Sequence, residues 1–171
     1  MKFGVVIFPS KKLQDLVNSY RKRYDPHYSL IPPHLTLKGP FEADENDMDA
    51  LADKLKVIAK KYQPFTYQVS KVKSFQPVSN VVYLKVDPHE TLSALNEEMQ
   101  SDEFPKNDEE FAFVPHLTVA QSLSNAEHHD VYNSLNMLSI EEEEKVDRFH
   151  LLYQLENGAW TVYETILLGR E

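Results

Sequence analysis

Two kinds of hydrophobic pattern alternate along the chain. Four segments place apolar residues every three to four positions, which is the spacing of one face of an amphipathic helix. The segments between them are short and rich in β-branched or aromatic residues, as β-strands are. The pattern predicts helices at 11–24, 48–62, 89–99 and 124–138. It predicts strands at 3–8, 65–75, 81–86, 146–155 and 160–168, and extended segments at 32–37 and 114–119.

Turn residues separate several of these elements and predict how the strands are connected. Asn157-Gly158 lies between the last two strands, and this dipeptide is the strongest short signal for a β-hairpin. A turn at 77–80 separates the strands at 65–75 and 81–86, so we expect these two strands to form a second hairpin.

The tetrapeptide Pro-His-Leu-Thr occurs twice, at 33–36 and at 115–118. Each copy follows a strand and a helix, and each precedes a helix and a strand. In both copies the histidine lies 35 residues before the middle of a later predicted strand. We therefore infer two half-repeats, roughly 1–78 and 79–171, packed as the lobes of a single bilobal domain around a pseudo-two-fold axis.

The two motifs place the same side chains on one face of a strand. Residues i and i+2 share a face, so His34 and Thr36 point to one side while Leu35 points to the other. His116 and Thr118 follow the same rule. The pseudo-symmetry would bring these two imidazoles and two hydroxyls together across a shared groove.

This set of groups is suited to phosphodiester chemistry. Two histidines that face one small volume form an acid–base pair near neutral pH: one removes a proton from water or a hydroxyl, and the other protonates the leaving oxygen. Threonine hydroxyls donate hydrogen bonds to nonbridging phosphoryl oxygens. The pattern therefore favours cleavage of a phosphodiester without a metal ion, and it leaves open which histidine is the acid.

Two less specific interpretations compete with this one. A single His-x-Thr in a strand usually has no function, and it is the second copy in a matching context that favours a site. Zinc binding is the other interpretation, but two histidines leave the ligand set short, and no carboxylate or third histidine stands at a suitable spacing. We therefore expect neither a metal nor a cofactor.

Composition and charge narrow the range of partners. The absence of cysteine excludes disulfides and thiol nucleophiles, and four scattered glycines exclude the Gly-rich phosphate loops. No apolar run is long enough to span a membrane, and we expect a cytoplasmic protein. The net charge of −9 divides into +5 over residues 1–80 and −14 over residues 81–171. The acidic second half argues against coating of long nucleic acid and favours a small or terminal phosphodiester.

The motifs His-Leu-Thr-Leu at 34–37 and His-Leu-Thr-Val at 116–119 resemble those of the two-histidine (2H) phosphoesterase superfamily. This group includes RNA 2′,5′-ligase-like proteins and cyclic nucleotide phosphodiesterases, and the chain looks closest to its bacterial YjcG-like branch. The resemblance implies an α+β fold of two lobes, each a mixed and mostly antiparallel sheet with helices on the outside, and a central groove lined by the motifs. The implied catalytic residues are His34 and His116, and the implied phosphate-binding residues are Thr36 and Thr118.

The residues and the resemblance together predict a metal-independent phosphoesterase that hydrolyses a 2′,3′-cyclic or 2′,5′-linked phosphodiester. The natural substrate, the direction of the reaction and the oligomeric state stay open. A non-catalytic module that binds a nucleotide or an RNA end is the alternative. A pair of lobes without any ligand is a third interpretation, which requires the two His/Thr faces to be buried or far apart.

Several other polar and aromatic residues have two interpretations each. Arg148 and His150 alternate on one strand face and either reach the groove or form a solvated face. Lys38 follows the first motif, and its direction depends on where that strand ends. The histidines at 128–129 are expected on a solvated helix surface, and the acidic run at 141–144 on a solvated edge or loop. The strand aromatics either stack on a base or pack in the core: Tyr67, Tyr83, Tyr153 and Trp160.

Overall fold

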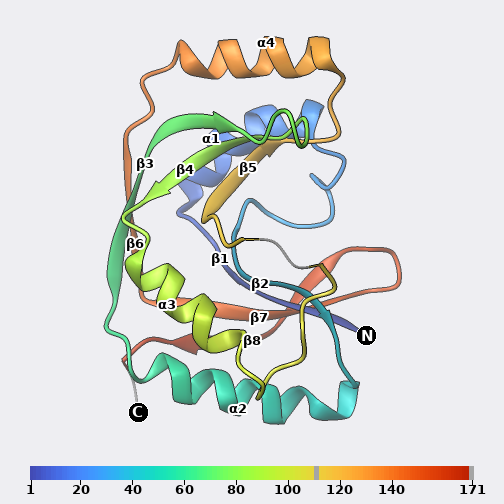
Figure 1. Cartoon of the computed structure of the whole chain (residues 1–171), viewed down its shortest axis with the longest axis vertical. Helices are drawn as coiled ribbons and strands as arrows, with labels where there is room; N and C mark the ends of the chain where they lie inside the picture. Colours follow the sequence, from blue (N-terminus) through green and yellow to red (C-terminus); the bar gives the residue numbers. More distant parts are fainter. Residues whose placement is uncertain (110–111, 170–171) are drawn as a thin grey trace.

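The computed structural model describes residues 1–109 and 112–169, and these residues fold around one β-sheet (Figure 1). The helices are α1 (Lys11–Tyr24), α2 (Met48–Ala59), α3 (Glu90–Met99) and α4 (Asn125–Asn136), with a 3₁₀ turn at Glu45–Asp47. The strands are β1 (Lys2–Ile7), β2 (Leu35–Glu42), β3 (Phe65–Ser74), β4 (Val82–Asp87), β5 (His116–Ala120), β6 (Glu142–Val146), β7 (Arg148–Gln154) and β8 (Trp160–Leu167). Each predicted helix is present, and its ends agree with the prediction to within three residues.

The sheet has eight strands in the order β6-β3-β4-β5-β2-β1-β7-β8, and every neighbouring pair is antiparallel. Both predicted hairpins are confirmed, because β3 pairs with β4 and β7 pairs with β8. The α+β class, the antiparallel strands and the outer position of the helices are confirmed as well.

The two expected sheets are in fact one curled sheet. The first and second motifs lie on β2 and β5, and these strands pair at Leu35 and Leu117. This short contact joins the four-stranded arm β6-β3-β4-β5 to the four-stranded arm β2-β1-β7-β8. The junction of the two arms therefore lies directly beneath the two motifs.

The two halves of the chain also exchange strands across this junction. One arm is β6-β3-β4-β5, although β3 comes from the first half of the chain. The other arm is β2-β1-β7-β8, although β7 and β8 come from the second half. Figure 1 shows this as red strands beside the blue β1, and the green β3 beside the orange β6. The half-repeats at 1–78 and 79–171 stay a prediction, and the exchange ties the two halves into one folding unit.

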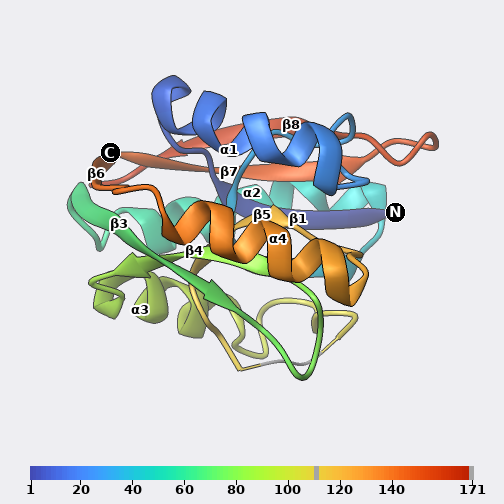
Figure 2. The ribbon, with the colours of Figure 1, turned by 90° about the horizontal axis from the view of Figure 1, so that it is seen from above.

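The helices cover the outside of the sheet. α2 packs near β8 and α4 near β3, and they lie at opposite ends of the molecule (Figures 1 and 2). α1 contacts β5 and α3 contacts β2, so each of these helices bridges from one arm to the central strand of the other. The leucines of the two motifs are fully buried in the core. None of the helices in the described residues has the length and apolarity that crossing a membrane requires.

The acidic run at 141–144 lies at an edge of the sheet, one of the two places expected for it, because its last three residues begin the edge strand β6. Glu141 and Glu143 are exposed, as expected, but Glu144 is buried. The Glu144 carboxylate accepts hydrogen bonds from the backbone N–H of Ser10 (2.5 Å) and from the Ser10 hydroxyl (2.9 Å). Ser10 caps α1, and the positive end of a helix dipole favours a carboxylate there. The sequence showed the charge but not this distant partner.

One of the two adjacent histidines of α4 is also buried rather than solvated. His128 is 6% exposed, and its Nε2 lies 2.6 Å from the hydroxyl oxygen of Ser74 on β3. His129 is exposed, as predicted, because the next position on a helix turns away from the packed face.

Candidate active site

The register of β2 and β5 places the two motifs against each other in antiparallel order. Leu35 is the residue opposite Leu117. Continuing this register by one residue in each direction places His34 opposite Thr118, and His116 opposite the remaining threonine, Thr36. The side chains of opposite residues share a face and lie about 5 Å apart, while diagonal neighbours lie about 7–8 Å apart. Each histidine therefore faces the threonine of the other motif, and the two imidazoles are diagonal neighbours.

Both histidines are held in the same tautomer by the same local structure. Nδ1 of His34 lies 2.9 Å from the carbonyl oxygen of Pro32, and Nδ1 of His116 lies 2.6 Å from that of Val114. A carbonyl oxygen only accepts, so in the neutral ring Nδ1 carries the proton and donates it in both cases. Nε2 of each ring is therefore left without a proton, ready to accept one from a ligand in the groove.

The pKa of each imidazole lies below its ordinary value. Burial, together with the smaller effect of the positive charges of Arg21 and His116, lowers the pKa of His34 to about 4, although the Pro32 carbonyl and Asp25 act in the opposite direction. Burial also lowers the pKa of His116, and the hydrogen bond to Val114 opposes that shift. Among these neighbours the Arg21 charge acts on His34 alone, so the two histidines are chemically different despite their similar geometry.

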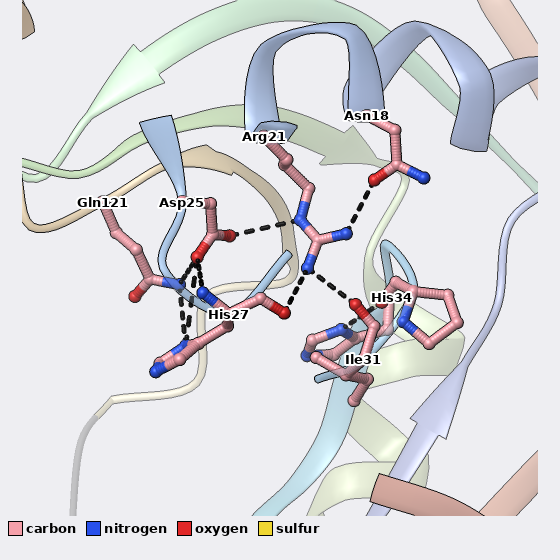
Figure 3. Close-up of polar contacts among 8 residues, drawn as sticks. Asn18, Arg21, Asp25, His27, Ile31, His34 and Gln121 are labelled. Atoms are coloured by element: carbon pink, nitrogen blue, oxygen red, sulfur yellow. Dashed lines mark hydrogen bonds and ion pairs between the residues drawn. The ribbon is translucent and has the colours of Figure 1, made fainter. Parts of the chain in front are cut away.

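Arg21 organises the loop that leads to the first motif (Figure 3). This side chain is 2% exposed, and its Nε donates to Asp25 at 3.1 Å. Its Nη2 donates to the carbonyl oxygens of Ile31 (2.7 Å) and His27 (3.3 Å). The guanidinium thus ties together both ends of the segment from 25 to 31, immediately before His34. A buried arginine that makes four hydrogen bonds is a rigid support for the position of that histidine.

Gln121 connects this network to the second motif. Its Nε2 donates to Asp25 Oδ1 at 2.9 Å and lies 3.1 Å from Nδ1 of His27 (Figure 3). Gln121 comes just after β5, so one amide joins the loop before His34 to the strand that carries His116. The network therefore fixes the two halves of the site relative to each other.

Three adjoining cavities open around the four motif residues. A cavity of about 200 Å³ is lined by both His34 and Thr118. A second of about 330 Å³ is lined by His34 and Thr36, and a third of about 700 Å³ by Thr36 and His116. Two of these pairs, His34 with Thr118 and Thr36 with His116, are those that the β2–β5 register places together, and the third, His34 with Thr36, shares one face of β2.

An aromatic cluster supports His116. The rings of Phe75 and Tyr83 stack with centroids 4.3 Å apart, and each lies 5.2 Å from the imidazole centroid of His116. These contacts hold the ring orientation and exclude water from one side of it. Of the four aromatics singled out in the sequence, Tyr83 thus borders the site, and Trp160 lines the cavity at His34. Tyr67 is buried in the core, and Tyr153 packs against Tyr163.

No three histidine, aspartate or glutamate side chains gather as a metal-binding group within residues 1–109 and 112–169. The residues of the two motifs that line the cavities contribute two imidazoles and two threonine hydroxyls. Their chemistry is that of proton transfer and hydrogen-bond donation to an oxyanion.

Comparison with known proteins agrees with this chemistry. A family model described as the 2′-5′ RNA ligase superfamily matches residues 8–158. A relative from Bacillus pumilus (strain SAFR-032), named "Putative phosphoesterase", is 57% identical over 171 residues and covers 100% of this chain and 99% of its own. The chain belongs to the 2′-5′ RNA ligase superfamily. The 2H phosphoesterase resemblance of the two motifs is thereby confirmed, and the protein is an enzyme of the phosphoesterase class.

Solved structures of other proteins show the same fold. The protein TT0787 of Thermus thermophilus is 19% identical, covers 100% of both chains and has a TM-score of 0.70. E. coli LigT complexed with 3′-AMP is 18% identical, covers 99% of this chain and 98% of its own, and has a TM-score of 0.69. At these identities the likeness establishes the fold and leaves the substrate of this superfamily member to be argued from its own residues.

Arg148 and His150 do not line any of the three cavities around the motifs. The His150 ring packs 5.0 Å from that of Phe8, and its Nδ1 lies 2.9 Å from the Thr165 hydroxyl oxygen. Arg148 is exposed and pairs with Asp147. β1 separates β7 from β2, which places both side chains away from the motifs.

Lys38 is buried because β2 carries an irregularity just after the first motif. Val6 lies opposite Thr36, but the preceding Val5 lies opposite Lys38, so Leu37 is an extra residue on β2. An extra residue of this kind is a β-bulge, and it interrupts the alternation of faces. Lys38 consequently packs inside, 1% exposed, although it is also among the residues that line the cavity at His34 and Thr36.

Sequence reasoning did not single out Arg21, Gln121 or Phe75 as parts of the site. A signal for Arg21 was available, because it continues the four-residue spacing of Leu13 and Val17 on the buried face of α1. A charged residue in line with an apolar stripe is usually buried with a partner. No comparable local signal marks Gln121 or Phe75, because their contacts are with distant parts of the chain.

Proposed function

We propose that this protein hydrolyses a small or terminal phosphodiester, 2′,3′-cyclic or 2′,5′-linked, by metal-independent acid–base catalysis between His34 and His116. The observation that carries the proposal is the pairing of Leu35 with Leu117, because this register, continued by one residue in each direction, sets each histidine opposite the threonine of the other motif. The cavities shared by His34 with Thr118 and by His116 with Thr36 support it. A phosphodiester bound among the two histidines and the two threonines has one imidazole on each side. Thr36 and Thr118 donate hydrogen bonds to its two nonbridging oxygens.

The two histidines take different roles because their surroundings differ. His34, next to the Arg21 charge, stays neutral over a wide pH range, and its free Nε2 removes a proton from the attacking water. The oxygen of that water forms the new bond to phosphorus, and the bond from phosphorus to the ribose oxygen breaks. The second imidazole, that of His116 in its protonated form, gives its proton to the departing oxygen. The products of a cyclic substrate are a phosphate monoester and a free ribose hydroxyl.

Charge supports a small or terminal substrate rather than long RNA. The second half of the chain carries a net −14, and an acidic surface of this kind weakens binding of a polyanion. A single phosphodiester that enters between the motifs is exposed to less of that repulsion. The absence of cysteine fits work in the reducing cytoplasm, where we place the protein.

Binding of a nucleotide or RNA end without turnover is the alternative function. It is favoured by one observation: the lowered pKa of both histidines leaves little imidazolium at pH 7 to act as the acid in the free protein. A bound phosphate dianion or monoanion raises the pKa of a neighbouring imidazole, which restores the acid once the substrate is present. The two functions therefore differ in whether the bound ligand is consumed.

The test is hydrolysis of 2′,3′-cyclic nucleotides and 2′,5′-linked dinucleotides in the presence of EDTA. We expect turnover by the natural protein, and a loss of about 10²–10⁴-fold in each of His34→Ala and His116→Ala. His129→Ala, which removes an exposed histidine on α4, is the matched control and keeps full activity. Tight binding of the products without any hydrolysis identifies the binding module instead, and full activity in either motif variant rejects both histidine roles.

A further inference from the structure

The largest of the three cavities, about 700 Å³, extends from Thr36 and His116 to the residues that follow α3 and to the segment before β5. Phe75 and Phe113 form part of its wall, and the Phe75 ring is already held in a stack. A volume of this size, lined by two aromatic residues and by His116, has room for a nucleoside. Flat aromatic walls stack on a nucleobase irrespective of which base it is. Any preference among bases must therefore come from the polar groups of the cavity.

The polar groups of this cavity include three side-chain amides, and the orientation of each is determined by its partner. Lys38 Nζ donates to Gln100 Oε1 at 2.8 Å and to Asn107 Oδ1 at 2.9 Å. An ammonium group only donates, so the oxygens of both amides face Lys38 and their NH₂ groups are left to the cavity. Asn96 is oriented the other way, because its NH₂ donates to the carbonyl oxygen of Leu37 at 2.7 Å and its oxygen is left free.

The buried position of Lys38 costs the protein folding free energy. No aspartate or glutamate among the described residues lies within ion-pair distance of its buried ammonium, which rests over the Phe41 ring at 5.1 Å. Burial lowers the pKa of Lys38 to about 8, so the group is still mostly charged at pH 7. A buried charge without a counter-charge destabilises a fold, and an apolar side chain would serve packing better. What the lysine does provide is the fixed orientation of two amides.

The charges around the cavity favour a neutral ring over a second phosphate. Asp108 and Glu109 both line it, and Lys2, which also lines it, is neutralised by its ion pair with Asp108 at 2.8 Å. The Lys38 ammonium does not itself border the cavity, since Gln100 and Asn107 stand in front of it. The carboxylates would repel a further phosphate, whereas an uncharged base can form hydrogen bonds with the amide donors and with the one amide acceptor.

Those amides match one class of base edge. Uracil and guanine present a carbonyl oxygen next to a ring N–H, whereas cytosine and adenine present an NH₂ next to an unprotonated ring nitrogen. Resting on the proposed function, we propose that this cavity is a base-selecting subsite in which Gln100 and Asn107 donate to a keto oxygen and Asn96 accepts from the adjacent N–H. Lys38 is its positioning residue. The substrates preferred by this subsite are uridine and guanosine phosphodiesters, and an amino base places its NH₂ against the NH₂ groups of the cavity.

Binding of the four nucleoside 3′-phosphates, measured by calorimetry at pH 7, tests this selection without requiring turnover. We expect uridine 3′-phosphate to bind about tenfold more tightly than the cytidine compound, and the guanosine compound more tightly than the adenosine one by a similar factor. In Lys38→Met both ratios fall close to one, because the amides are free to rotate. Lys54→Met is the matched control, since Lys54 also lies over a phenylalanine ring but outside the cavity, and it keeps both ratios.

A second variant is designed to reverse the base preference of the cavity. Gln100→Glu keeps an oxygen for Lys38 and presents its other oxygen to the cavity, so it acts as an acceptor where the natural residue is a donor. We expect it to prefer the cytidine and adenosine compounds. Equal binding of all four nucleotides by the natural protein, an absence of binding, or unchanged ratios in Lys38→Met overturns the inference. Hydrolysis without base preference rejects only this subsite, and base preference without hydrolysis rejects only the catalytic function.

Discussion

Leu35 and Leu117 lie opposite each other where the two arms of the sheet meet, and both side chains are fully buried. The residues on either side of them point the other way and form the candidate active site. The pairing of these two leucines therefore determines the arrangement of the site, because the register that buries the leucines also sets each histidine opposite a threonine. A shift of the register by one residue would bury the histidines and expose the leucines.

The threonine hydroxyls carry the first prediction. We expect Thr36→Val and Thr118→Val to lower kcat by roughly a hundredfold each, because each removes one hydrogen-bond donor from the developing phosphorane charge. The shape of the side chain is kept, so the melting temperature should change little. Thr66→Val, on an exposed position of β3, is the control. Unchanged steady-state kinetics in both motif variants would contradict phosphate contacts by the threonines.

The pKa values of the two histidines predict an acidic optimum for kcat/KM. His34 acts as a base only above its pKa of about 4, and His116 acts as an acid only below its own pKa, which burial holds under 6.5. A plot of kcat/KM against pH is therefore bell-shaped, with its maximum between the pKa values of the two histidines. Rate measurements over the acidic and neutral range check this. In His34→Ala, the residual kcat/KM should no longer fall at acidic pH, because the base that titrates there is gone. If it instead no longer falls at alkaline pH, His34 is the acid and His116 the base.

Arg21 and Lys11 allow a matched comparison on one helix. Arg21 and Asp25 form a buried pair four residues apart, both side chains 2% exposed, and Lys11 and Asp15 form an exposed pair at the same spacing. We expect Arg21→Met to lower the free energy of unfolding by about 3–5 kcal/mol, because it leaves the carboxylate of Asp25 buried without the arginine that balances its charge. Lys11→Met should cost under about 0.5 kcal/mol. Urea denaturation at pH 7 measures both, and similar small losses would refute the structural role of Arg21.

Lys38→Met is expected to be at least as stable as the natural protein at pH 7. Burial lowers the pKa of Lys38 from 10.5 to about 8, so the unfolded chain binds the proton more tightly than the folded chain does. The cost of burying the charge is therefore fully present below pH 8 and is relieved as the pH rises from 8 to 10.5. The advantage of the variant should shrink over the same range in thermal melts. An advantage that grows with rising pH, or a variant clearly less stable than the natural protein at pH 7, would contradict an uncompensated charge.

Helices and hairpins were the parts of the fold that local sequence could predict. The stripe of Leu13 and Val17, the cap at Ser10 and the turn at Asn157-Gly158 act within a few residues, so the chain segment itself contains their cause. The same holds for the identity of the site residues, because a repeated His-x-Thr places both groups on one strand face. The sequence by itself thus determined the elements, the family resemblance and the four candidate side chains.

The tertiary structure decided everything that depends on distant partners. Strand pairing between β2 and β5 set which histidine faces which threonine, and the bulge at Leu37 turned Lys38 inward. Burial lowered the pKa of His34, and Arg21 made it unlike its symmetric counterpart. Hydrogen-bond registers, burial and electric fields depend on groups that are far apart in the chain and close in space. A local pattern names the chemical groups of this protein, and only the folded chain gives each group its environment.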